Sequence, residues 1–277
     1  MWLTETASGD KAALARQATE LARAAMPAVD IEILWDGMWV RRVGPDYFPD
    51  PDLFSAVPNW ERWAGQARKH VRDAEDYWFH LYKPRAGDVI VDIGAGRGED
   101  VFAFSRAVGP AGHVWAIEPH PVSCSALRHL CALNRLANVT ALNYACMDRA
   151  RELQIETLPV WESNYVRTGE PSASSHLVNG VRFDDLAAEH GMERIDFLKM
   201  NIEGAERWAL PGCEKALRRA QCACIAAHDF RADRGEGDTF RTLELVKEFV
   251  AAAGFEIVMR EDPRYYVPYH VHGVRRG

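Results

Sequence analysis

The sequence predicts an α/β fold in which helices pack on both faces of a mostly parallel sheet. Residues 89–93 form a short apolar run whose only acid is Asp92, which is typical of a strand buried on both faces. Glycine occupies every second position of residues 94–98, where it permits a tight turn and a close approach of a ligand to the backbone. Residues 99–108 then have the pattern of a helix. This order of strand, glycine turn and helix opens a nucleotide-binding sheet.

The N-terminal part of the chain has a different character. Residues 8–26 carry an apolar stripe at helical spacing. Residues 30–35 and 38–43 flank an Asp-Gly pair, a strong signal for a two-residue hairpin turn. Residues 44–58 are rich in proline and are expected to be irregular. We therefore expect residues 1–58 to form an accessory region beside the main domain.

Residues 59–277 are expected to form the main α/β domain. Asn59 is a plausible N-cap of a helix that runs toward Leu81. Residues 149–180 lack clear periodicity and are predicted to form a long loop or lid. The other predicted strands and helices follow one another as strand 113–118, helix 121–136, strand 139–144, helix 181–190, strands 195–200 and 222–227, helix 239–253, and strands 255–260 and 265–274.

Composition narrows the class of protein. The net charge of −7 over 277 residues disfavours a general nucleic-acid binder, which would carry a basic face. The six cysteines include no C-x-x-C pair, so reduced thiols and a cytoplasmic location are expected. No apolar run reaches transmembrane length and no signal-peptide core is present, so no membrane insertion is expected.

The spacing of the glycine turn bears on the ligand. The dinucleotide fingerprint G-x-G-x-x-G would place its third glycine at Glu99, and a carboxylate there would oppose a pyrophosphate. S-adenosylmethionine has no phosphate, and its sulfonium and ammonium groups are cationic. The order D-x-G-x-G-x-G over residues 92–98 therefore favours S-adenosylmethionine, although such a turn also occurs in loops that bind no ligand.

Two further segments are candidates for cofactor contacts. Glu118 ends the second predicted strand and precedes Pro119, a position from which an acid can accept hydrogen bonds from both ribose hydroxyls. The alternative is a solvent-exposed strand end. Cys146 and Asp148 follow the third strand, where an adenine ring would rest. Asp148 could accept from the adenine amino group, or it could be an ordinary turn acid.

Three motifs resemble the FkbM family of S-adenosylmethionine-dependent methyltransferases: DIGAGRG at 92–98, IEPHP at 117–121 and DFLKMNIEGAE at 196–206. The resemblance covers roughly residues 77–275. It implies a Rossmann-like class I methyltransferase fold, with a mostly parallel seven-stranded sheet and an antiparallel last strand. It also implies O-methylation of a hydroxyl on a small-molecule acceptor such as a secondary metabolite, a sugar or a lipid.

The resemblance assigns the site residue by residue. By the resemblance, Asp92, Gly94, Gly96 and Glu118 would bind the cofactor. Ala95, Pro119, Cys146 and Asp148 are further candidate contacts beside these positions or after the third strand. Asn201, Glu203 and His228 would line the reaction centre. The family usually has Asp at the position of Asn201 and often Glu at that of Ala226. Because both departures remove a carboxylate, no metal is expected.

A hydroxyl is a weak nucleophile and benefits from a base within hydrogen-bond reach. His228 ends the fifth predicted strand and has an ordinary pKa suited to that role, while Glu203 could be the base or an orienting group. His228 could instead only orient its loop, and Glu203 could only favour a helix start. N- or C-methylation, a catalytically weak S-adenosylmethionine-binding or scaffolding protein, and a nicotinamide oxidoreductase are the alternative functions. A homodimer is possible.

Overall fold

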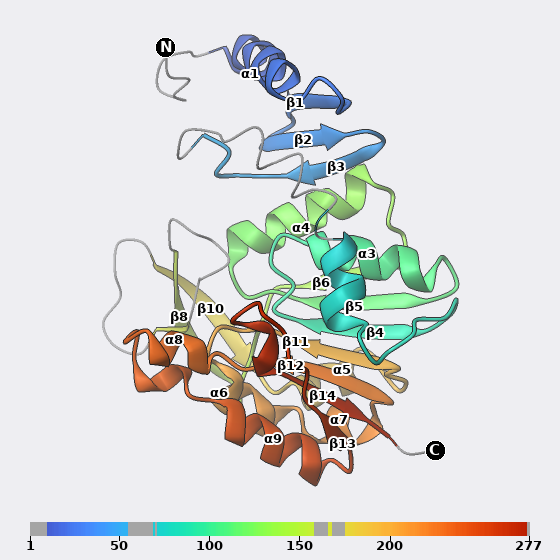
Figure 1. Ribbon diagram of the computed structural model, residues 1–277, viewed down its shortest axis with the longest axis vertical. Coiled ribbons are helices and arrows are strands. Elements are labelled where there is room, and N and C mark those ends of the chain that lie inside the picture. Colours follow the sequence, from blue (N-terminus) through green and yellow to red (C-terminus); the bar gives the residue numbers. More distant parts are fainter. Residues whose placement is uncertain (1–9, 55–68, 70, 158–165, 168–174, 276–277) are drawn as a thin grey trace.

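The computed structural model describes residues 10–54, 69, 71–157, 166–167 and 175–275 (Figure 1). Its centre is a seven-stranded sheet in the order β13-β14-β12-β11-β4-β5-β6. The strands are β4 (Val89–Ile93), β5 (His113–Ile117), β6 (Val139–Leu142), β11 (Phe197–Met200), β12 (Cys222–Ala226), β13 (Glu256–Val258) and β14 (His270–Val274).

The pairing of these strands confirms the predicted fold class. The pairs from β12 to β6 are parallel, and β14 runs antiparallel to both of its neighbours, β12 and β13. β4 lies in the interior of the sheet, with β11 on one side and β5 on the other. The carboxyl ends of β4, β5 and β11 therefore meet at one edge, where ligands of such sheets bind.

Helices cover both faces of the sheet. Ile90 faces a layer that contains the π-helix η2 (Ala74–Trp78), α3 (Glu99–Val108) and α4 (Pro121–Leu133). Its neighbour Val91 faces the layer of α5 (Phe183–Glu189), α7 (Glu214–Arg219) and α9 (Leu243–Ala252). Successive strand residues point to opposite faces, so this central strand is buried on both sides, as its apolar sequence predicts.

Several short helices in the described part of the main domain connect these larger elements. They are α6 (Glu206–Ala209), η4 (Leu210–Gly212), α8 (Asp229–Asp233), η5 (Asp238–Phe240) and η6 (Val267–Tyr269). Among the described residues, no helix is both long and apolar enough to span a bilayer.

The N-terminal region has one strand more than the sequence predicts. Helix α1 (Lys11–Ala25) packs on a sheet of β1 (Ile31–Trp35), β2 (Trp39–Val43) and β3 (Asp46–Pro49). The expectation of an irregular segment over 44–58 was wrong for β3. This strand pairs with β2 at the edge of the sheet, where proline is tolerated because its missing N–H costs no ladder hydrogen bond.

This N-terminal region docks on the outer side of α3 and α4, at one end of the molecule (Figure 1). Phe48 of β3 meets Phe102 of α3 edge-on, with ring centroids 5.3 Å apart. The side chain of Asn134 both accepts from and donates to the backbone of Tyr47. The predicted boundary at 58/59, and the predicted N-cap Asn59, lie outside the described residues, so the domain division stays a prediction.

A second, four-stranded sheet occupies part of the predicted loop over 149–180. It contains β7 (Ala145–Cys146), β8 (Arg151–Glu156), β9 (Val166–Arg167) and β10 (Ser175–Val181), in the order β7-β10-β8-β9. Its long antiparallel pair places Leu153 opposite Val178, and both are buried. The expectation of a long loop is therefore wrong for these segments. The polar residues of β8 and β10 obscure the alternation that marks a half-buried strand.

Candidate active site

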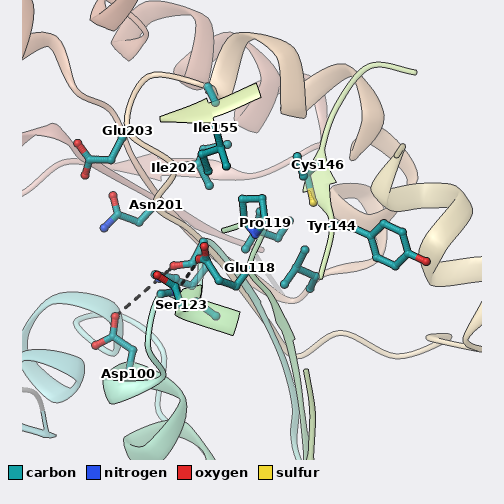
Figure 2. A pocket seen from close by; sticks show the side chains of 18 of the residues that line it. Asp100, Glu118, Pro119, Ser123, Tyr144, Cys146, Ile155, Asn201, Ile202 and Glu203 are labelled. Atoms are coloured by element: carbon teal, nitrogen blue, oxygen red, sulfur yellow. Dashed lines mark hydrogen bonds and ion pairs between the residues drawn. The ribbon is translucent and has the colours of Figure 1, made fainter. Parts of the chain in front are cut away.

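A cavity opens at the carboxyl ends of β4, β5 and β11 (Figure 2). Tyr144 and Cys146 lie at one end of this cavity and Glu203 and Asn201 at the other. The residues assigned from sequence that line it are Gly94, Ala95, Gly96, Glu118, Pro119, Cys146, Asn201 and Glu203. Asp92, Asp148 and His228 are not among the lining residues, and each has another place in the structure.

The glycine turn forms one wall of the cavity, and its three glycines adopt backbone angles that other residues rarely adopt. Gly94, Gly96 and Gly98 have φ angles of 81°, 57° and 95°, in the left-handed region. A Cβ atom on Gly94 would lie 2.0 Å from the carbonyl oxygen of Asn201. The turn from β4 is thus pressed directly against the turn that follows β11.

Glu118 holds the glycine turn from the end of β5. Its two carboxylate oxygens accept hydrogen bonds from the backbone N–H groups of Gly96 and His120, each at 2.8 Å. Burial raises the pKa of Glu118 to about 7, against the lowering effect of these two bonds. A buried carboxylate that lines the cavity is suited to accept hydrogen bonds from ribose hydroxyls through its remaining lone pairs.

Asp92 lies beneath the cavity instead of lining it. It is fully buried, and its carboxylate is 2.7 Å from the ammonium of Lys199, its partner in the register of β4 and β11. Burial raises the pKa of Asp92 to about 6, and the charge of Lys199 opposes this rise. Lys199 also donates to the carbonyl oxygen of Gly94 at 2.9 Å, so this pair fixes the start of the glycine turn.

Lys199 and Asp100 both line the cavity, although they were not among the site residues expected from sequence. A lysine inside an apolar strand was the available signal for Lys199, because such a charge is buried only with a partner. Asp100 lies in the first turn of α3, where Trp78 Nε1 donates to its carboxylate at 2.9 Å. Asp100 and Glu99 both line the cavity at the start of α3. A helix start attracts anions, but these two carboxylates oppose the binding of an anion here.

Asp148 does not line the cavity, so the cofactor contact expected from sequence stays a prediction. Its carboxylate forms an ion pair with Arg151 at 3.1 Å, and its backbone carbonyl accepts from Arg182 at 2.9 Å. Tyr144, Cys146 and Ile155 line the cavity instead. The apolar character of these side chains suits a flat aromatic ring.

Glu203 lies at the opposite end of the cavity in an unusual conformation. Its φ of 54° is in the left-handed region, which costs a non-glycine residue about 1–2 kcal/mol. Its carboxylate is 2.6 Å from Arg231 and 3.1 Å from Nε2 of His228. Burial alone would raise the pKa of Glu203, but His228 and Arg231 outweigh it and hold the pKa below its usual value. Glu203 is therefore ionised at neutral pH.

His228 does not line the cavity, and its surroundings do not favour the base role expected from sequence, which stays untested. Its ring is buried between two carboxylates, with Nε2 3.1 Å from Glu203 and Nδ1 3.0 Å from Glu206. Burial lowers the pKa of His228, but the two carboxylates prevail and raise it to about 10. Both ring nitrogens are thus protonated and engaged near neutral pH. The sequence pattern showed only a histidine at a strand end, and it revealed neither the burial of His228 nor its contact with Glu206.

Glu206 and Asp229 complete the surroundings of His228. Glu206 is fully buried and accepts from the hydroxyl of Thr242 at 3.1 Å. Asp229 accepts from the backbone N–H groups of Thr242 and Leu243, each at 2.8 Å, at the start of α9. Asp229 therefore caps the start of this helix. Within the described part of the chain, no group of three His, Cys, Asp or Glu side chains is arranged to hold a metal ion.

The charge on His228 predicts a pH dependence of stability. Its pKa in the folded chain, about 10, exceeds its unfolded value near 6.5, so the folded state binds one more proton between these values. The contribution of His228 to the free energy of unfolding is fully present below pH about 6.5. Above that pH it should fall by up to about 1.4 kcal/mol per pH unit. Urea unfolding of the unmutated chain and of His228→Gln at pH 6.5 to 9.5 measures this slope. Equal slopes for the two proteins would contradict a charged His228.

Comparison with protein-family models gives a match over more than half of the chain. The model of the methyltransferase FkbM domain matches residues 92–257. The chain is 27% identical over 223 residues to the 31-O-demethyl-FK506 methyltransferase FkbM of Streptomyces tacrolimicus. This alignment covers 68% of this chain and 80% of that protein. It is 31% identical over 91 residues to the AMB antimetabolite synthetase AmbE of Pseudomonas aeruginosa, covering 32% of this chain and 4% of that one.

The solved structure of methyltransferase FkbM from Methylobacillus flagellatus KT has a similar fold. The alignment has a TM-score of 0.50 and 17% sequence identity. It covers 76% of this chain and 51% of the other, so the shared part is about half of that solved chain.

Proposed function

We propose that this chain, which belongs to the FkbM family of methyltransferases, transfers the methyl group of S-adenosylmethionine to a hydroxyl group of a small molecule. The observation that carries the proposal is the placement of Glu203. This ionised carboxylate lines the same cavity as the glycine turn, and two cationic side chains fix it there.

The residues of the cavity fit S-adenosylmethionine. Glu118 would accept from the ribose hydroxyls, and Tyr144 and Cys146 would border the adenine. The acids Glu99 and Asp100 suit the cationic methionine end of this cofactor and would repel a pyrophosphate. Lys199 does not alter this balance, because Asp92 neutralises its charge.

The cofactor supplies a methyl group that is already activated for displacement at carbon. The protein therefore has to position the acceptor oxygen and remove its proton. In the proposed mechanism Glu203 accepts a hydrogen bond from the hydroxyl. The proton of that hydroxyl becomes more acidic as the oxygen donates electrons to the new bond, so a weakly basic carboxylate can take it. Asn201, which also lines the cavity, would orient the acceptor.

His228 and Arg231 act on Glu203 from behind. They keep its carboxylate ionised and fix its direction, and neither has to touch the acceptor. The name of the Streptomyces tacrolimicus relative, an O-demethyl-FK506 methyltransferase, also favours oxygen as the acceptor atom. N- or C-methylation, and a protein that binds the cofactor without turnover, are the outcomes that would replace this proposal.

Replacing Glu118 with alanine should weaken S-adenosylmethionine binding by about 1–3 kcal/mol. The substitution removes the ribose contact and leaves the N–H groups of Gly96 and His120 without their partner. Glu118→Gln should not rescue binding, because its amide NH2 would face one of these N–H groups. Isothermal titration measures the affinity, with exposed Glu189→Ala as a control. Near-normal affinity of Glu118→Ala would refute the ribose assignment.

The acceptor is found by a transfer assay. The protein is incubated with methyl-labelled S-adenosylmethionine and matched pairs of compounds that differ only in a hydroxyl or an amino group. We expect label in hydroxyl-bearing members. Label confined to amino-bearing members would overturn O-methylation. Cofactor binding without transfer to any compound, in panels that include cell extracts, would favour the non-catalytic alternative.

A further inference from the structure

Arg97 is a buried cation within the glycine turn that points away from the cavity. Its side chain is 3% exposed, and its residue lies between two glycines in the left-handed conformation. It does not line the cavity that borders the turn on its other side. A buried guanidinium is costly unless acids and hydrogen bonds compensate it.

The acids that compensate Arg97 come from the N-terminal region, residues 10–54. Asp50 lies 2.7 Å from one terminal nitrogen of Arg97, and Asp52 pairs with the other. The side chain of Asp50 is only 14% exposed, whereas that of Asp52 is 46% exposed. Each contact joins residues more than 40 positions apart in the chain. Both acids lie outside the segment that matches the family model, which begins at residue 92.

Asp50 is itself fixed in place. Its backbone N–H donates to the carbonyl oxygen of Trp39 at 2.8 Å, and its carboxylate lies 3.5 Å from Nε of the buried Arg41. Phe48, two residues before Asp50 in the chain, packs on Phe102 of α3. The acid that meets Arg97 therefore belongs to a packed surface that cannot readily follow a movement of the glycine turn.

The position of Arg97 couples this surface to the cofactor site. The neighbouring residue, Gly96, donates its N–H to Glu118 at 2.8 Å. A shift of the Arg97 backbone would move this N–H, and with it the carboxylate assigned to the ribose. The sheet side of the turn is anchored separately, because Gly94 and Ala95 donate to the carbonyl oxygen of Ile117.

We infer that the N-terminal region clamps the cofactor-binding turn through Arg97 and that Arg97 is a positioning residue for S-adenosylmethionine. The inference rests on the proposed cofactor. It gives a role to a region that the sequence analysis treated only as accessory. The turn needs such an anchor because glycine leaves its backbone more conformational freedom than any other residue.

The test compares two ion pairs between the same two parts of the protein. Asp50→Asn removes an acid from Arg97, whereas the control Asp46→Asn breaks the pair with Arg106, 2.6 Å apart, on the outer surface of α3. Isothermal titration with S-adenosylhomocysteine should show a loss of about 3- to 30-fold for Asp50→Asn, a range typical of coupling residues. Asp46→Asn should change affinity by less than about twofold.

Three further measurements separate positioning from general stability. Asp52→Asn, at the more exposed partner, should show a smaller loss in the same direction and serves if Asp50→Asn does not fold. Arg97→Lys should bind better than Arg97→Met, because it keeps the charge. Once an acceptor is known, the KM for S-adenosylmethionine should rise for Asp50→Asn while kcat changes little.

The outcomes distinguish this inference from the proposed function. If the unmutated protein binds S-adenosylhomocysteine and every variant binds it equally well, the clamp is wrong, even when melting temperatures fall. An equal loss for Asp46→Asn and Asp50→Asn would also overturn it, because any disturbance of the N-terminal region would then suffice. If the unmutated protein binds neither S-adenosylhomocysteine nor S-adenosylmethionine, the proposed function itself fails and the clamp falls with it.

Discussion

Glu203→Gln should lower kcat by about 10²- to 10⁴-fold, the range for loss of a general base, with the KM for S-adenosylmethionine almost unchanged. Glutamine keeps the shape of the side chain but cannot take the proton of the acceptor. His228 and Arg231 hold the pKa of Glu203 below its usual value, and the pKa of His228 is about 10. At saturating S-adenosylmethionine, the kcat of the unmutated enzyme should therefore vary little between pH 6 and 9, with no ionisation of a histidine base near neutrality.

Glu236 offers a matched control for this substitution. It also pairs with Arg231, at 2.7 Å, but does not line the cavity. Glu236→Gln should keep kcat within a fewfold of normal, so a shared loss would point to Arg231 and not to a base. Steady-state kinetics gives kcat for both variants and so distinguishes loss of a base from loss of the Arg231 ion pair. Nearly full turnover of Glu203→Gln would mean that positioning alone carries the reaction.

Lys199→Met should destabilise the protein by about 3–5 kcal/mol, the cost of leaving a buried charge without its partner. Asp92 is completely buried and lies 2.7 Å from this lysine. Without the lysine, burial would raise the pKa of Asp92 above its present value of about 6. A protonated Asp92 has no charge to bury, so the loss of stability should be smaller at pH 5 than at pH 8.

A second substitution separates the charge from the packing. Adding Asp92→Asn to Lys199→Met removes the stranded carboxylate and should recover part of the lost stability. Lys247→Met, which breaks an exposed pair with Glu244, should cost no more than about 1 kcal/mol. Urea unfolding of these proteins gives the free energies. A double variant less stable than Lys199→Met would contradict a role for Lys199 in neutralising Asp92.

The central part of the fold could be predicted because local signals and burial agree there. The apolar run of β4, its glycine turn and the following helix α3 appear at the residues that the sequence indicates. The acid of Glu118 at the end of β5 also lines the cavity, as its position predicts. A strand buried on both faces has few alternatives, so its sequence pattern is strong.

The parts that were missed depend on distant contacts. β8 and β10 stabilise each other through cross-strand pairs such as Leu153 with Val178, which neither segment reveals alone. The charge of His228 depends on Glu206, which lies 22 positions away and reaches it only in the folded chain. The burial of Asp92 beneath the cavity likewise depends on a distant residue, because it pairs with Lys199 on the neighbouring strand.

The most direct test of the proposed O-methylation is the identity of the atom that receives the methyl group. The protein is supplied with S-adenosylmethionine that carries ¹³C in its methyl group and with the acceptor found by the transfer assay, and the product is examined by NMR. We expect a labelled methyl carbon bonded to oxygen, formed at least about a hundredfold more slowly by Glu203→Gln under the same conditions. A labelled methyl bonded to nitrogen or carbon would contradict it.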